Sequence, residues 1–240
     1  MYLTDEKKLN VSLSGLFYTR KWNDHVPYIY FEKITGKKIF LRKINKKSKD
    51  LKIIFNSSMV SEIESDLWED SGWLKKHILF VCESNLLEVK KIRPPKDSLV
   101  SCKLLGPSDI PLLLEIDKNI FEPYWKNSYS NFIETIKTSN NNYLFKIYYN
   151  DIPCGYAILG ETRGFTYLQR FGIDKAFQKK GMGKELLSYI LSFAKAKNFK
   201  KMKLNTQSTN QAALSLYTNN TFEVLEKKLV IMGSVGDKQG

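Results

Sequence analysis

A short lysine-rich loop with two glycines, Gln178-Lys179-Lys180-Gly181-Met182-Gly183-Lys184, has the residue types of a phosphate-binding turn. Glycine lets the backbone turn tightly and approach a ligand closely, so that successive N–H groups and the positive end of a following helix face one point. The three lysines add a positive field suited to a diphosphate. A Gly-x-Gly before a helix is often only a turn, so this loop must be judged in its context.

Cysteine and histidine offer little competing chemistry. Cys82, Cys102 and Cys154 are odd in number, lack C-x-x-C spacing and lie in strand-like segments, which is typical of reduced core thiols in a cytoplasmic protein. Cys154 has no histidine near it in sequence, so we interpret it as a core residue and not as a nucleophile. His25 and His77 are far apart, and the sequence therefore predicts no metal site.

The net charge of +13 is compatible with a solvated basic surface, with nucleic acid and with a polyanionic cosubstrate. The densest cationic cluster, residues 37–52, alternates with apolar residues, which favours the exposed face of a strand pair over an RNA-binding ribbon. Nucleic-acid binding through this face is kept only as a third hypothesis. The chain has no stretch of about 18 apolar residues and no signal-like start, so no membrane partner is expected.

Elements before the adjacent prolines Pro94 and Pro95 form a small unit of strands and helix. We place a domain boundary at residues 92–98, because proline cannot donate to a strand ladder and favours extended structure. The first domain, 1–97, is predicted as a small α+β domain of unknown role. Its expected elements are strands at 13–19, 28–32, 38–44 and 51–55, a helix at 59–74, and a closing hairpin at 78–82 and 86–90.

The second domain, 98–240, has a clearer order of elements. Asn150-Asp151 predicts a tight hairpin between two strands, and Pro107, Ser108 and Asp109 predict a helix start. The helix that starts at Pro107 is expected to run to about residue 120, and three further helices are expected at 129–138, 183–197 and 210–218. The expected strands are 100–105, 143–149, 153–161, 166–173, 201–206 and 222–232.

Two further segments give the loop its context: Asn205-Thr206-Gln207-Ser208-Thr209-Asn210, and Ala212-Ala213-Leu214-x-Leu216-Tyr217. With these residues in this order and spacing, the chain resembles the GNAT N-acetyltransferases over residues 100–232. It is similar to an actinobacterial branch of unassigned substrate that carries Tyr167-Leu168-Gln169-Arg170 on the fourth strand. A looser similarity is to the ribosomal-protein alanine acetyltransferases.

The resemblance implies a GNAT fold: a mixed, mostly antiparallel sheet, flanked by helices, whose fourth and fifth strands splay apart to admit the pantetheine arm of acetyl-CoA. Main-chain groups of Phe171 and Ile173 would bind that arm, and Asn205 and Asn210 would lie near it. For Asn210, capping of the following helix alone is an equal alternative. The pyrophosphate would be held by Gln178, Lys179, Lys180, Gly181, Met182, Gly183 and Lys184.

The same resemblance implies that a primary amine attacks the thioester directly in a ternary complex and that Tyr217 protonates the departing sulfur. A buried helical aromatic is the alternative for Tyr217. Relatives place a glutamate on the fourth strand, whereas residues 165–173 hold no carboxylate. The general base therefore stays open between Glu161, Asp117, Glu122 and water, and the lack of an obvious base favours an amine of low pKa.

The acceptor is expected to be a small molecule or a protein N-terminus. The linker Phe121-Glu122-Pro123-Tyr124-Trp125 would form the acceptor-binding edge, although core packing of its aromatic residues is equally expected. An alternative function is a CoA-binding regulatory or scaffold protein without turnover. The oligomeric state stays open. Asn219 or Asn220 is expected to end the tyrosine helix in a left-handed conformation, because the usual glycine is missing.

Overall fold

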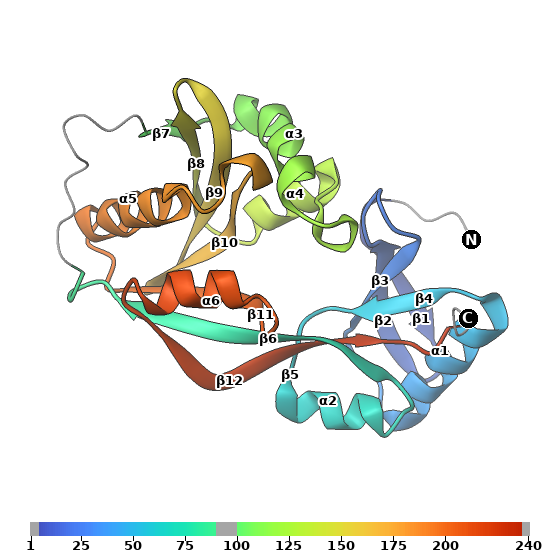
Figure 1. The fold of residues 1–240 in the computed structure, drawn as a ribbon. Helices are drawn as coiled ribbons and strands as arrows, with labels where there is room; N and C mark the ends of the chain where they lie inside the picture. Colours follow the sequence, from blue (N-terminus) through green and yellow to red (C-terminus); the bar gives the residue numbers. More distant parts are fainter. Residues whose placement is uncertain (1–4, 90–99, 237–240) are drawn as a thin grey trace. The chain divides into compact units, whose positions relative to one another are not determined.

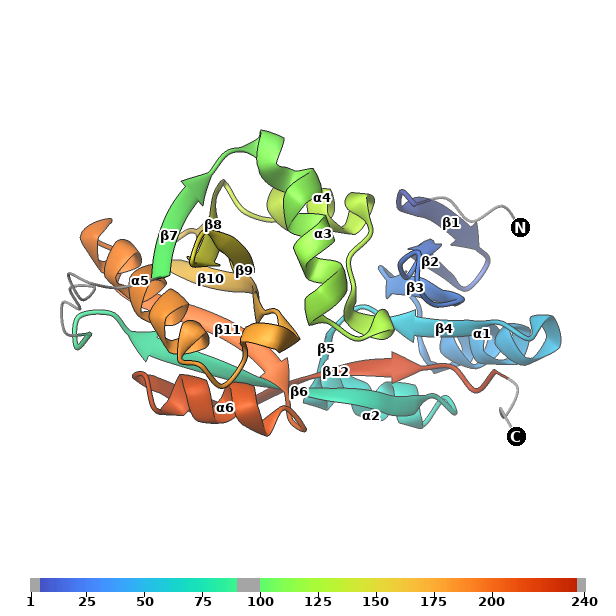
Figure 2. The same cartoon turned by 45° about the horizontal axis from the view of Figure 1, so that its top comes forward.

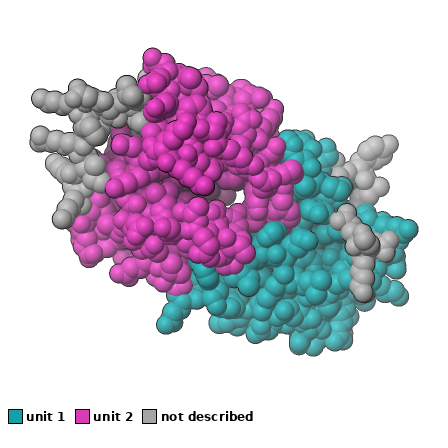
Figure 3. All heavy atoms as spheres, viewed as in Figure 1, with its two compact units in different colours: residues 1–80, 226–240 teal, residues 81–225 magenta. Residues whose placement is uncertain are grey.

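The computed structural model describes residues 5–89 and 100–236. The chain falls into two compact units, residues 1–80 with 226–240 and residues 81–225, which are coloured separately in Figure 3. Strands β6 (Leu74–Asn85) and β12 (Phe222–Gly233) contribute residues to both units. The predicted boundary at residues 92–98 lies outside the described residues, so the division into 1–97 and 98–240 stays a prediction.

The first unit is a sheet with two helices (Figure 1). Its strands follow the order β1-β2-β3-β4-β12, with β5 paired to β12, and only the β3–β4 pair is parallel among the pairs whose register is described. The elements are β1 (Lys8–Ser12), β2 (Gly15–Lys21), β3 (Tyr28–Lys33), α1 (Lys38–Leu51), β4 (Ile54–Ser57), β5 (Val60–Ser61) and α2 (Glu62–Glu69).

Both helices of this unit cover the same face of its sheet. The ring of Phe31 on β3 lies 6.1 Å from Phe40 of α1 and 5.8 Å from Trp68 of α2, measured between centroids. A capping box at Ser61 and Glu64 starts α2, as its sequence favours. The aromatic cluster is thus the core that the apolar residues of the N-terminal region build.

Two predictions for this region were wrong. The predicted strand at 38–44 is the start of α1, whose buried Phe40, Leu41 and Ile44 follow helical spacing. Of the predicted hairpin, residues 78–82 lie within one long strand, β6, which ends at Asn85, and residues 86–88 form a turn. The N–H of Leu86 donates to the carbonyl of Lys200 (2.8 Å), and residue 90 lies outside the described residues. Alternation of charged and apolar residues over a few positions fits both periods, which explains the error at α1.

The second unit follows the predicted order of elements closely. Its strands follow the order β6-β11-β10-β9-β8-β7, with β10–β11 parallel and β7–β8, β8–β9 and β9–β10 antiparallel. The elements are β7 (Val100–Leu105), η1 (Pro107–Asp109), α3 (Ile110–Ile120), η2 (Pro123–Trp125), α4 (Tyr129–Lys137), β8 (Asn141–Tyr149), β9 (Ile152–Thr162), β10 (Phe165–Ile173), η3 (Lys175–Phe177), α5 (Met182–Ala196), β11 (Lys201–Gln207) and α6 (Gln211–Thr218).

Helices cover both faces of this sheet. In β9, Ala157 and Leu159 belong to the core under α5, whereas Tyr156 and Ile158 belong to the core under α3 and α4. Figure 2 shows α5 on one side of strands β8–β10 and the α3–α4 pair on the other. The predicted α+β class with a mixed, mostly antiparallel sheet is confirmed. None of the helices within residues 5–89 and 100–236 is long and apolar enough to span a membrane.

Candidate active site

The sheet of the second unit opens between β10 and β11. Leu168 and Leu204 are the last paired residues of these two parallel strands, and both strands continue beyond them. The ends that no longer pair with each other, residues 169–173 of β10 and 205–207 of β11, are called the fork below. Backbone groups that face the fork have no partner on the opposite strand, so an extended ligand could bind there as an additional strand-like neighbour.

The main chain of Phe171 and Ile173 faces the fork. The N–H of Asp174 donates to the carbonyl of Cys154 on β9 (2.8 Å), and successive strand residues point their N–H and C=O groups to opposite sides. The main-chain N–H and C=O groups of Phe171 and Ile173 therefore point away from β9 and toward the fork. The side-chain amide of Gln178 donates to the Ile173 carbonyl (2.9 Å), so Gln178 ties the lysine-rich loop to the end of β10.

A β-bulge in β10 determines which side chains lie beside the fork on the α3–α4 side. The register with β9 shifts between Leu168 and Arg170, which makes Gln169 the extra residue. The Gln169 amide donates to Thr138 Oγ1 (2.8 Å) and Ser139 Oγ (2.9 Å) just after α4. Arg170 also contacts α3, so the successive polar side chains of Gln169 and Arg170 both lie on the face opposite α5.

The lysine-rich loop enters α5 through a left-handed residue. Gly181 is the N-cap with φ 85°, and a Cβ added there would meet nothing within 4 Å. The helical hydrogen bond from the N–H of Glu185 reaches the Gly181 carbonyl (3.1 Å), so the amides of Met182, Gly183 and Lys184 precede it. These amides and the positive end of the helix dipole make this end of α5 suited to an anion.

The side chains of the loop divide into two groups. Lys179, Lys180 and Lys184 are exposed, and Lys180 Nζ lies 5.3 Å from the ring centroid of Phe177. Met182 is 5% exposed and packs in the core under α5. Met182 can therefore contribute only main-chain groups to an anion site.

Close packing at Gly183 joins the loop, the fork and α6. A Cβ at Gly183 would lie 3.4 Å from Leu216 Cδ2 and 3.8 Å from Ile173 Cγ1. Leu216 precedes Tyr217 on α6, and Ile173 ends β10. These are ordinary van der Waals distances, so the start of α5 lies against both the end of β10 and α6.

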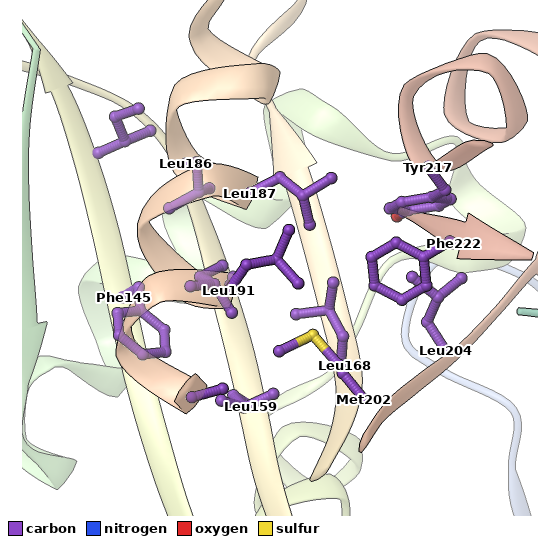
Figure 4. Packing of buried hydrophobic residues seen from close by; sticks show 14 of the residues in the cluster. Phe145, Leu159, Leu168, Leu186, Leu187, Leu191, Met202, Leu204, Tyr217 and Phe222 are labelled. Atoms are coloured by element: carbon purple, nitrogen blue, oxygen red, sulfur yellow. The ribbon is translucent and has the colours of Figure 1, made fainter. Parts of the chain in front are cut away.

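Tyr217 lies beside the fork. Its side chain is 6% exposed, and its ring centroid is 6.1 Å from that of Phe171 and 5.6 Å from that of Phe222. Figure 4 shows Tyr217 next to Phe222 and across from Leu187 of α5. Its hydroxyl has no hydrogen-bond partner within the described part of the chain. Burial raises the pKa of this phenol well above its ordinary value, so it stays protonated and remains a donor.

Asn205 and Asn210 have different partners. Asn210 Oδ1 accepts a hydrogen bond from the N–H of Ala213 (3.1 Å), so its capping role is confirmed and its contact with a cosubstrate stays a prediction. Asn205 Oδ1 accepts from the Tyr167 hydroxyl (2.6 Å), which bridges β10 and β11 at the base of the fork. Burial raises the pKa of Tyr167 to about 12, so a neutral phenol holds this bridge.

The end of α6 corrects one prediction. Asn219 is right-handed with φ −74°, and the left-handed residue is Thr221 with φ 72°. The Asn220 side chain donates to the Leu216 carbonyl instead (2.7 Å). A hydrogen bond between Thr221 Oγ1 and Ser84 Oγ (2.8 Å) helps hold a conformation that is rare for a β-branched residue.

Two of the three candidate bases lie apart from the fork or are already paired. Glu161 is opposite Thr166 on β10, at the paired end of that strand, and it accepts from the Tyr143 hydroxyl (3.2 Å). Glu122 is exposed and its Oε1 lies 2.6 Å from Lys175 Nζ. The hydrogen bond from Lys175 lowers the pKa of Glu122, which makes this carboxylate a weaker base.

The third candidate, Asp117, is fully buried in an ion pair. Its Oδ1 accepts from Arg170 Nη2 (2.6 Å), from Arg170 Nε (3.0 Å) and from the Tyr156 hydroxyl, and its Oδ2 accepts from the N–H of Asn127 (2.9 Å). Both oxygens are engaged, so Asp117 is an ion-pair partner. Arg170 has no role among the sequence-based predictions. The signal that could have identified it is a charged residue within a strand predicted to be buried.

The buried cysteines fit the expectation of core thiols. Cys82 and Cys154 are free and fully buried. Burial raises the pKa of Cys154 to about 11, which removes the thiolate that a nucleophile needs. The side chain of Cys102 lies outside the described residues.

Known structures share the fold of the whole chain. The N-acetyltransferase from Sphaerobacter thermophilus (GCN5-related) is 11% identical with a TM-score of 0.66, and the match covers 94% of this chain and 81% of that one. The GCN5-related N-acetyltransferase from Kribbella flavida is 11% identical with a TM-score of 0.64, covering 98% and 91%. A tandem GNAT protein of the clavulanic acid biosynthesis pathway is 9% identical with a TM-score of 0.68, covering 97% and 84%. The likeness therefore includes the N-terminal region, for which the sequence indicated no known motif.

The amino-acid sequence was also compared with known proteins and families. No curated protein matches this chain. Residues 110–222, which include α3, the fork, the lysine-rich loop and Tyr217, match the acetyltransferase (GNAT) family. Residues 110–222 thus form a GNAT acetyltransferase domain, which supports an acyltransferase enzyme, and the general cosubstrate of that family is acetyl-CoA.

Proposed function

We propose that this protein transfers the acetyl group of acetyl-CoA to a primary amine by direct attack, with both substrates bound together. The observation that carries the proposal is the end of β10–β11 pairing at Leu168 and Leu204, directly beside Tyr217. A fork alone would not indicate a binding site, because strands can separate without binding a ligand. A fork next to a helix start and a buried phenol supports a site for a thioester on a phosphorylated arm.

The residues of the fork and the loop fit acetyl-CoA. The fork-facing main chain of Phe171 and Ile173 would bind the amide groups of pantetheine, as a neighbouring strand does. The amides at the start of α5, with Lys179 and Lys184 beside them, would bind the diphosphate. The open space above Gly181 leaves room for phosphate oxygens to approach the backbone.

Tyr217 would act on the sulfur as it leaves. The amine nitrogen forms a bond to the carbonyl carbon, the carbon–sulfur bond breaks, and the surplus proton of the nitrogen goes to water. The raised pKa of Tyr217 makes complete proton transfer to a thiolate of ordinary pKa near 8.5 unfavourable. The phenol therefore stabilises the charge on sulfur as a hydrogen-bond donor, and the thiolate then takes its proton from water.

The engaged carboxylates restrict the acceptor. Asp117 lies in an ion pair, Glu122 pairs with Lys175, and Glu161 lies on β9 opposite Thr166, away from the fork. With water as the only proton acceptor, the site reacts only with amine molecules that are already in the free-base form. At pH 7 an α-amine of pKa near 7.8 is about 14% free base, against about 0.04% for a lysine side chain. An α-amine is therefore the acceptor that this site suits.

Release of free thiol from acetyl-CoA, measured with a panel of α-amines and alkylamines, tests the proposal. Thiol release that depends on the amine, with equal formation of the N-acetyl product, is the expected result. Binding of acetyl-CoA without turnover for every amine would contradict the proposal and support the alternative of a CoA-binding scaffold.

A further inference from the structure

Arg170 links strand β10 to the linker between α3 and α4. Its Nη2 donates to the Trp125 carbonyl (2.6 Å) and to Asp117 Oδ1, and its guanidinium carbon lies 3.5 Å from the ring centroid of Phe121. Asp117 in turn accepts from the N–H of Asn127. The beginning, middle and end of the linker are thus held by one ion pair.

These contacts use only part of the guanidinium. Arginine has five N–H donors, and Arg170 uses Nε for Asp117 and Tyr156 and Nη2 for Asp117 and Trp125. Across the described residues its Nη1 has no hydrogen-bond partner. The side chain as a whole is 14% exposed.

Arg170 lies on the face of the sheet from which an acceptor would come. The lysine-rich loop opens α5, which covers one face, whereas Arg170 contacts α3 on the other. A cosubstrate whose diphosphate binds at the start of α5 and whose thioester lies in the fork leaves the α3–α4 face for the amine. Arg170 directly precedes Phe171, whose main chain lines the fork.

We propose that Arg170 Nη1 donates a hydrogen bond to a carbonyl oxygen on the carbon next to the amine-bearing carbon of the acceptor. The acceptor class is then the α-amino amide, as at the N-terminus of a peptide. This inference rests on the proposed function and narrows its acceptor. It agrees with the independent argument from the engaged carboxylates, because such α-amines are the ones with a low pKa.

The charge balance at Arg170 favours a neutral carbonyl over a free carboxylate. Asp117, fully buried, already compensates the guanidinium charge. A second carboxylate would have to lose its hydration beside a pair that carries no net charge, which is costly, whereas a carbonyl loses less. Free amino acids are therefore expected to be poorer acceptors than their amides.

Three matched amines test the assignment in the 240-residue chain: alaninamide, isopropylamine and alanine. They share one skeleton and differ only in one substituent on the amine-bearing carbon, which is an amide, a methyl group or a carboxylate. We expect kcat/KM, expressed per free-base amine at saturating acetyl-CoA, to be at least about tenfold higher for alaninamide than for either of the others. Equal values for alaninamide and isopropylamine, or a preference for alanine, would overturn the assignment without contradicting amine acetylation itself.

The variant Arg170→Lys keeps the charge beside Asp117 but has no Nη1. Its advantage for alaninamide over isopropylamine should fall to within about twofold, while the Kd of acetyl-CoA stays unchanged. A purely structural role would slow both amines equally and leave the ratio intact, which would refute the proposal. Lys175→Gln removes an exposed cation of the same unit and should preserve the ratio. If Arg170→Lys does not fold, the wild-type ratio alone decides; if no amine reacts, the proposed function fails first.

Discussion

Lysine is dense in two segments of this protein, residues 37–52 and residues 178–184, and each is associated with a helix. In α1 the cations project from a regular helix whose Phe40 and Leu41 pack into the core, and its first residue follows an extended N-cap without a side-chain cap. In the second segment a left-handed Gly181 exposes the first amides of α5 beside the fork. Similar composition thus produces a solvated face in one place and a candidate anion site in the other.

The difference shows that charge density alone does not make a binding site. Exposed lysines on α1 create a positive field, but salt screens such a field over about 8 to 10 Å. The loop adds directed N–H donors, an open approach to the backbone and a neighbouring strand end. Four substitutions or titrations should separate these contributions.

The largest effect is expected at the phenol next to the fork. Tyr217→Phe removes the donor to the leaving sulfur, so kcat should fall about 10² to 10⁴-fold while the Kd of acetyl-CoA changes little. Steady-state thiol release and calorimetric binding measure the two quantities. Tyr129→Phe, at an exposed tyrosine of α4, is the matched control. A wild-type kcat for Tyr217→Phe would rule out its role.

The next effect concerns the backbone of the loop. Gly181→Ala places a residue with a side chain in a left-handed conformation, which costs about 1–2 kcal/mol. The loop must therefore either move its amides or remain strained. We expect acetyl-CoA to bind about tenfold more weakly. Gly164→Ala is the control, because Gly164 also has positive φ (95°) and open space but lies in the β9–β10 turn. Equal loss of affinity in both variants would contradict a site at the loop.

The pH profile tests the chemistry of the acceptor amine and of Tyr217. Free-base α-amine rises from about 14% at pH 7 to about 94% at pH 9, so kcat/KM should rise about sevenfold and then level off. Burial raises the pKa of Tyr217, so the donor form is lost only at a pH above the ordinary pKa of tyrosine. Initial rates at pH 6–10 measure the profile. A decline between pH 8 and 10 would be inconsistent with a buried, protonated Tyr217.

The smallest effect compares one lysine from each segment. Lys184→Gln removes an exposed cation beside the α5 amides, and acetyl-CoA binding should weaken about two- to fivefold at low salt and less at high salt. Lys46→Gln in α1 removes an exposed cation of the other segment and should leave the affinity unchanged. The same loss for both lysines would mean that net charge, and not position, governs binding.

The elements of the second unit could be predicted because their local signals agree. Asn150 and Asp151 both have positive φ, as the tight hairpin requires, and Asn210 caps α6 as expected. In the N-terminal region the signals conflict. The segment that begins α1 contains alternating apolar and charged residues over its first turns, and only packing of Phe40 and Ile44 against the core selects the helix.

The candidate site was predictable where a residue acts through its own backbone or its own helix. Gly181, Lys184 and Tyr217 could be named as candidates because loop composition and helix order are local properties, and their roles stay predictions. Arg170 and Tyr167 were not, because their roles depend on partners far away in sequence. Asp117 is 53 residues from Arg170, and Asn205 is 38 residues from Tyr167.

By itself the sequence determined the family, the order of elements in residues 100–232 and the glycine loop that opens α5, because each of these depends on spacing along the chain. Only the tertiary structure decided where β10 and β11 separate, that a bulge at Gln169 places Arg170 on the face opposite α5, and that Asp117 compensates that charge. Strand register and ion pairing depend on distances through space between remote residues, and no local pattern encodes them.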